Sequence, residues 1–91
     1  MVSVVQLTDA MVQNIVDNVA KKIANRMLKE DKYEEEELLE LPEWKDAVEF
    51  YKQLVKADES LGNMFSRRLD KALTQSIRIA PNIQRYVLKN G

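Results

Sequence analysis

Residues 11–30 read MVQNIVDNVAKKIANRMLKE, in which two apolar residues alternate with two polar residues five times in succession. A β-strand requires alternation with a period of two, whereas apolar pairs four residues apart stay close together only on a helix. Because an α-helix turns about 100° per residue, each repeat shifts the apolar pair by roughly 40° around the helix axis. The apolar stripe therefore winds around the helix, and we expect different levels of it to pack against different neighbours.

A winding apolar stripe predicts that this first helix is the central element of a small bundle, and that it also reaches a partner chain. Ala20 and Ala24 are small and four residues apart, so a second helix could approach closely at that level. The candidate protein-interface residues are the members of the stripe with the aromatic residue that follows it: Met11, Ile15, Val19, Ala20, Ile23, Ala24, Met27 and Tyr33.

The composition predicts one all-α domain spanning residues 1–91, since 45% of the residues are hydrophobic and only four are glycine or proline. A domain of this size buries only about 60 to 65% of the surface of its unfolded chain. A partner that covered the remaining apolar surface would add stability, so we expect a homo-oligomer, with contact to another protein as well.

Residues 1–7 precede the first helix signal, and we expect them to form a disordered N-terminal segment. They lack the basic flank and the long apolar core of a secretory signal. No apolar run in the chain approaches the roughly 20 residues that a membrane-spanning helix requires. These features predict a cytoplasmic protein that has no membrane partner.

The chain contains neither cysteine nor histidine. Their absence removes the thiolate and imidazole metal ligands and the commonest general base. We therefore expect no enzyme activity, no metal ion, no cofactor and no small-molecule substrate. The carboxylates of residues 34–37 could in principle bind Mg²⁺ or Ca²⁺, but four consecutive glutamates on a helix point in four directions. A solvated acidic surface is the preferred interpretation.

Local signals divide the chain into four to five helices. Thr8 is a suitable N-cap for the first helix, which we expect to extend to about Lys29. A break is predicted near Asp31, where the apolar stripe ends, although a single helix reaching Glu40 stays open as an alternative. The further helices are predicted over residues 33–41, 42–62, 63–79 and 81–89, with Pro42 in the first helical position of its segment. In this division, Asp58 falls within the apolar face of the third helix, whose last turn we expect to fray.

Charge is segregated along the sequence. Residues 1–29 carry four basic and two acidic side chains, residues 30–60 four and twelve, and residues 61–91 six and one. In the basic third, Arg67, Lys71 and Arg78 recur at helical spacing opposite the apolar face, and Arg85 extends the series. Such a ridge could bind the phosphates of a nucleic acid, although a solvated helix face would have the same composition.

The sequence therefore predicts a non-catalytic adaptor or assembly module that contacts itself or another protein through faces of its first and third helices. The alternative is a nucleic-acid-binding module that contacts phosphates through Arg67, Lys71, Arg78 and Arg85.

Overall fold

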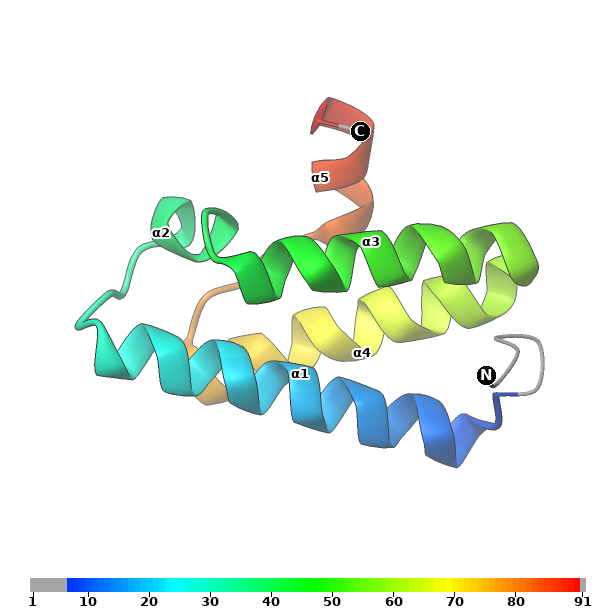
Figure 1. Ribbon diagram of the computed structural model, residues 1–91, viewed down its shortest axis with the longest axis horizontal. Coiled ribbons are helices and arrows are strands. Elements are labelled where there is room, and N and C mark those ends of the chain that lie inside the picture. The colour runs from blue at the N-terminus through cyan, green and yellow to red at the C-terminus, as the bar shows by residue number, and fades with distance from the viewer. Residues whose placement is uncertain (1–6, 91) are drawn as a thin grey trace.

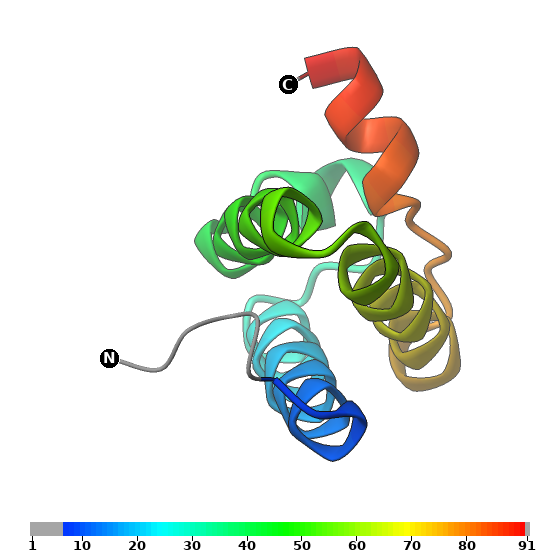
Figure 2. The same ribbon diagram turned by 90° about the vertical axis from the view of Figure 1, so that its right-hand side faces the viewer.

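The computed structural model describes residues 7–90 as five α-helices joined by short turns (Figure 1). They are α1 (Asp9–Lys29), α2 (Glu35–Leu39), α3 (Pro42–Ala57), α4 (Glu59–Ile77) and α5 (Ile83–Asn90). The three long helices lie side by side, with α3 antiparallel to both α1 and α4, and α5 projects from the α3/α4 side (Figure 1, Figure 2). The predicted all-α class is confirmed, and of the four to five helices predicted, the described residues form five. The disordered segment predicted for residues 1–7 lies outside the described residues except for Leu7, which packs against the core.

The first helix begins and ends where the sequence predicts. The Thr8 hydroxyl accepts a hydrogen bond from the Met11 N–H (3.2 Å), which caps the N-terminus. Beyond Lys29, the backbone of Asp31 adopts a left-handed conformation with φ 55°, and the Lys32 N–H donates to the Met27 carbonyl (2.9 Å). The chain therefore turns sharply here, and the alternative of one continuous helix to residue 40 is wrong.

The boundary between the third and fourth helices differs from the prediction. The third helix ends at Ala57 instead of Gly62, because Asp58 is extended (φ −162°) and begins the next helix. The Asp58 carboxylate accepts hydrogen bonds from the N–H groups of Ser60 (2.9 Å) and Leu61 (3.4 Å). Asp58 is thus the N-cap of α4 and not part of a frayed last turn of the third helix.

The core lies between α1, α3 and α4. Only one residue of each apolar pair in α1 is buried, and the buried positions follow the helical period of 3.6 residues. The third and fourth helices pack against each other and both contact α5, whereas α1 packs mainly on α4 and more lightly on α3. The prediction that the first helix is central to the bundle is therefore wrong, since α3 and α4 hold that position. The largest fully buried side chains are Trp44, Phe65, Ile23, Met27, Leu38, Leu54, Leu69, Leu73 and Ile83.

Candidate protein-interaction surface

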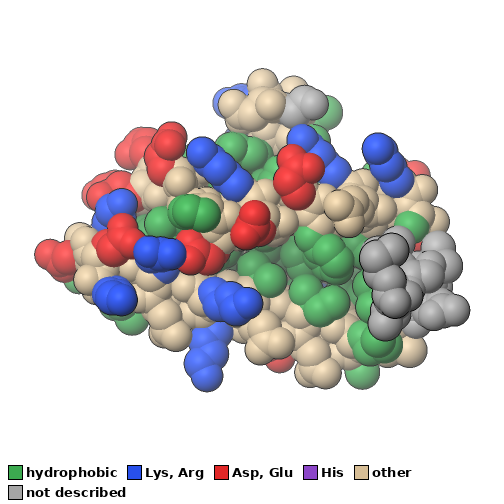
Figure 3. All heavy atoms as spheres, viewed as in Figure 1, with side chains coloured by type: hydrophobic (Ala, Val, Ile, Leu, Met, Phe, Trp, Pro, Cys, Tyr) green, Lys and Arg blue, Asp and Glu red, His purple; other side chains and the backbone are tan. Residues whose placement is uncertain are grey.

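A groove of about 440 Å³ runs between α1 and α3. Hydrophobic side chains gather along this boundary on the face shown in Figure 3. The first helix contributes Ile15, Val19 and Lys22 to the walls, because these residues recur at intervals of four and three and so share one face. The third helix contributes Glu43, Asp46, Ala47 and Phe50, with the same helical spacing.

The antiparallel direction of the two helices fixes which residues face each other across the groove. Arg26 of α1 donates to the Glu43 carboxylate of α3 at 2.8 Å, so these two residues lie at the same level. Moving about one turn along both helices brings Lys22 level with Asp46, and a further turn brings Val19 level with Phe50. Phe50 is held by an edge-to-face contact with the buried Phe65 (5.1 Å between ring centroids). The groove therefore has one charged end and one apolar end.

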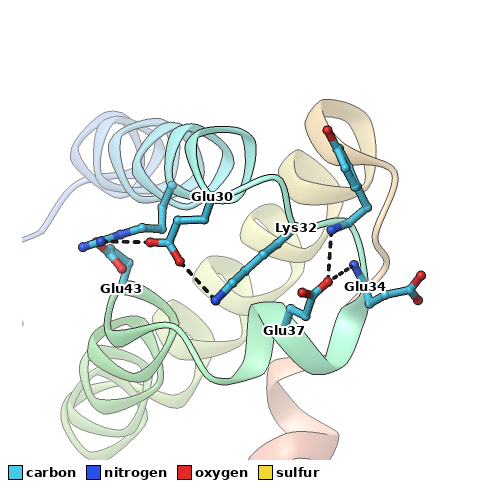
Figure 4. A network of polar contacts seen from close by, with 7 residues as sticks. Glu30, Lys32, Glu34, Glu37 and Glu43 are labelled. Atoms are coloured by element: carbon cyan, nitrogen blue, oxygen red, sulfur yellow. Dashed lines mark hydrogen bonds and ion pairs between the residues drawn. The ribbon is translucent and has the colours of Figure 1, made fainter.

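A network of ion pairs closes the charged end. The Arg26 guanidinium pairs with Glu43 and with Glu30 (3.1 Å), and the Lys32 ammonium pairs with the other oxygen of Glu30 (3.0 Å). Figure 4 shows Glu30, Lys32 and Glu43 of this network together with Glu37 of α2, which accepts hydrogen bonds from two backbone N–H groups. The hydrogen bond from Arg26 lowers the pKa of Glu43, and those from Lys32 and Arg26 lower the pKa of Glu30. Both carboxylates are thus held in the charged form.

One oxygen of the Glu43 carboxylate, Oε1, is buried and has no hydrogen-bond partner among residues 7–90. The indole N–H of the buried Trp44 also lacks a partner within the described part of the chain. A buried polar atom without a partner is costly. The Glu43 oxygen places an unused acceptor at the charged end of the groove.

The predicted interface residues of the first helix separate into three groups. Ile15 and Val19 line the groove, and Met11 is 38% exposed near the start of the helix. The structure corrects three other assignments: Ala20, Ile23 and Met27 are buried in the core of the chain itself, so almost none of their surface is left for a partner.

The remaining two predicted interface residues lie away from the groove. Ala24 is half-buried and shares a shallow depression with Ala20 and with Ala72 of α4, so the helix that approaches at the small residues belongs to the same chain. Tyr33 is 64% exposed at the turn between α1 and α2, where its hydroxyl donates to the Asp31 carboxylate (2.6 Å). That hydrogen bond raises the pKa of the Tyr33 hydroxyl.

A face of the third helix was predicted to make contacts, but without naming residues. Glu43, Asp46, Ala47 and Phe50 form that wall of the groove. A signal was present in Phe50, a large apolar residue that lies beside the buried line of Trp44, Ala47 and Tyr51 and is only half-buried.

The predicted basic ridge is brought together only in part. Arg67 and Lys71 are exposed on α4, and Arg78 follows as the left-handed residue (φ 58°) that ends this helix. At 1.5 Å per residue, these three span about 16 Å. Arg85 instead borders a separate depression between α2 and α5, beside Glu35. None of the four cations forms an ion pair within residues 7–90.

Two further findings concern the described residues 7–90 alone. None of their helices has the length and apolar character that crossing a bilayer requires. Their Asp and Glu side chains form no group of three or more arranged to hold a metal ion. Comparison of the chain with known protein families, with curated proteins and with solved structures gives no match.

Proposed function

We propose that this protein is a non-catalytic helical interaction module that self-associates and serves as an adaptor or assembly protein. The observation that carries the proposal is the open groove between α1 and α3, with Ile15, Val19, Ala47 and Phe50 in its walls. Apolar side chains at the centre of a surface, with charged groups beside them, are typical of protein–protein interfaces. The two helices that border the groove present apolar side chains on which helices of a partner can pack.

The small size of the chain supports the same proposal. A 91-residue domain leaves much of its apolar surface in contact with water, so covering the groove by association adds to stability. A chain without cysteine suits a reducing compartment, and we place this function in the cytoplasm.

Self-association through the groove predicts a specific effect of Val19→Asp. The wild-type mass measured by size-exclusion chromatography with light scattering should rise with concentration from the monomer towards the dimer. In Val19→Asp, a charge introduced into the apolar wall should weaken the dimer at least about tenfold, because an unpaired buried charge is costly. Leu28→Asp is the matched control, since Leu28 lies on the same helix, is 62% exposed and is outside the groove.

Circular dichroism at each concentration separates loss of association from loss of folding. A wild-type protein that stays monomeric up to about 1 mM would contradict self-association, because that concentration corresponds to a binding free energy of only about 4 kcal/mol. If Val19→Asp and Leu28→Asp weakened the dimer equally, the dimer contact would not lie in the groove.

A second candidate function is nucleic-acid binding by Arg67, Lys71 and Arg78. These cations are exposed, lie on one side of α4 and have no acidic partner among the described residues. A ridge about 16 Å long could contact several phosphates, since duplex DNA carries one charge per ≈ 1.7 Å of axis.

The ridge is tested by fluorescence anisotropy with labelled duplex DNA and single-stranded RNA in low salt. Arg67→Glu combined with Arg78→Glu should abolish binding, and wild-type affinity should fall steeply as salt is added. The control combines Lys21→Glu with Lys29→Glu, which makes the same charge change on α1. If the wild type fails to bind either nucleic acid, or if the two double variants lose binding equally, the ridge has no such role.

A further inference from the structure

The charges on the two walls of the α1/α3 groove are opposite at the same level. Lys22 projects from α1 and Asp46 from α3; both are exposed, and neither forms an ion pair within residues 7–90. Further along the groove, Val19 and Phe50 face each other and leave apolar surface on both walls. The groove therefore offers a cation on one wall, an anion on the other and an apolar region beyond them.

The positions of these charged and apolar residues favour one orientation of the two-fold axis of a dimer over the other. In a two-fold dimer, the same surface is used by both copies, so each contact occurs twice. An axis parallel to the groove places α1 of each copy on α3 of the other and keeps every residue at its own level. Lys22 then meets Asp46 of the second copy, and Val19 meets Phe50 of the second copy.

An axis that crosses the groove at right angles gives a poor match. It reverses the groove end to end and places α1 on α1, so that the charged end of one copy covers the apolar end of the other. Such an arrangement would bury Lys22 and Asp46 without partners, which is costly.

We infer that the occupant of the α1/α3 groove is a second copy of this chain, related by a two-fold axis parallel to the groove, with Lys22 of each copy paired to Asp46 of the other. This inference rests on the proposed function and adds the identity and orientation of the partner. Glu43, one turn from Asp46 on the same wall, is already paired with Arg26 (2.8 Å). Among the groove residues that the structure describes, Asp46 is therefore the carboxylate left to pair with Lys22 of the second copy.

The arrangement is tested by charge reversal in two variants that are studied separately and mixed. In Lys22→Glu, each dimer would hold two Glu–Asp contacts, and in Asp46→Lys two Lys–Lys contacts. We expect each variant alone to dimerise at least about tenfold more weakly than the wild type in sedimentation equilibrium. An equimolar mixture should recover dimers to within about threefold of the wild-type dissociation constant, because both contacts in the heterodimer again join opposite charges.

Recovery on mixing excludes an effect within one chain, since each chain in the mixture carries the same substitution that it carries alone. Lys21→Glu and Asp17→Lys are the matched controls, because both positions lie on α1 beside the depression that faces away from the groove. These controls, alone or mixed, should dimerise as the wild type does.

The outcomes separate this inference from the function on which it rests. A wild-type protein that stays monomeric overturns both. A wild-type dimer that Val19→Asp disrupts, but that the charge reversals weaken no more than the controls do, keeps self-association through the groove and overturns the two-fold arrangement. Failure of the mixture to recover dimers overturns the arrangement as well.

Discussion

Replacing Gly62 by valine is expected to lower the free energy of unfolding by about 3 kcal/mol, at the upper end of the usual cost of overpacking. Gly62 is buried in α4, where this helix passes closest to Val55 of α3. A Cβ atom added at Gly62 would lie 3.0 Å from the Val55 backbone nitrogen and 3.1 Å from its Cα, and would overlap the Val55 side chain. Because the closest neighbours include backbone atoms, the clash can be relieved only by moving the two helices apart.

The smaller change Gly62→Ala tests the same contact, because the contact decides whether alanine raises or lowers the free energy of unfolding. In an exposed helix interior, alanine is about 1 kcal/mol more favourable than glycine. At Gly62 we expect a net loss of about 1 kcal/mol, since the overpacking exceeds the gain in helix propensity. Urea unfolding followed by circular dichroism measures both variants. Gln75→Val, an exposed site on the same helix, is the control for the poorer helix propensity of valine.

If Gly62→Val proved as stable as Gln75→Val, the close approach of α3 and α4 would be absent. A Val55→Ala change made together with Gly62→Ala gives a double-mutant cycle, in which partial recovery is expected because only the side-chain part of the overlap is removed.

Gly62 also shows where prediction from this sequence reaches its limit. A glycine near the end of an apolar run favours a helix end, and the third helix was predicted to stop there. The structure places Gly62 inside a helix because a neighbouring helix passes too close for any side chain, and the sequence holds no local sign of that neighbour. The Asp58 prediction failed for a related reason, since an acidic residue in an amphipathic run fits either an interior position or an N-cap.

Features that depend on neighbouring residues alone were predicted correctly. Thr8 begins α1 and Pro42 begins α3, because a side-chain cap and a missing N–H act within one turn of the helix. The helix end near Asp31 was predicted from the lapse of the apolar stripe. The left-handed backbone of Asp31 was not, because that conformation usually calls for glycine or asparagine.

Two of the seven residues that line the groove were predicted from the sequence. The sequence identified Ile15 and Val19 on α1, because every apolar pair of that helix was a candidate for contact. It could not show which member of each pair the rest of the chain would bury, and so it also named Ile23 and Met27. A face of the third helix was predicted as well, but the residues of it that border the groove depend on the antiparallel placement of α3, which no local pattern of residues reveals.

The second large effect is expected at Asp70, a half-buried carboxyl on α4 that contacts the start of α5. Its Oδ1 atom accepts a hydrogen bond from the backbone N–H of Ile83, the first residue of α5 (3.4 Å). Burial raises the pKa of Asp70 to about 7, and the hydrogen bond from Ile83 opposes this shift only in part. The pKa of the Tyr51 hydroxyl on α3 is raised mainly by burial, and in addition by the negative charges of Glu59 and Asp70.

The direction of the pH dependence follows from proton binding. The ordinary pKa of an aspartic acid is 3.8, so between about pH 4 and pH 7 the folded chain holds a proton on Asp70 that the unfolded chain releases. Stability from this group is therefore full at about pH 4 and is lost as the pH rises through 7. A shift of this size sets an upper limit of about 4 kcal/mol, at about 1.4 kcal/mol per pKa unit. Because the side chain is partly exposed, screening by solvent reduces the expected effect to about 1 to 2 kcal/mol.

Asp70→Asn should remove this dependence, since asparagine keeps an oxygen that can accept from Ile83 and carries no charge. At pH 8 the variant should be more stable than the wild type by about 1 to 2 kcal/mol, and near pH 4 the two should be equal. The chain has no histidine that would titrate in this range. Hydrogen bonds and ion pairs lower the pKa of Asp9, Glu30 and Glu43, so these groups change stability only at more acidic pH.

Urea unfolding at pH 4.5, 6 and 8 measures the effect, with the fluorescence of Trp44 as the probe. Trp44 is the one tryptophan of the chain and packs edge to face on Tyr86 of α5 (5.6 Å between ring centroids), so its signal reports the α3/α5 contact. Asp17→Asn, an exposed site on α1, is the control and should leave the slope of stability against pH unchanged. A wild-type slope that persists in Asp70→Asn would assign the proton to another group. A flat wild-type profile would mean that water reaches Asp70 freely, and that the start of α5 is held to α4 without a buried carboxyl.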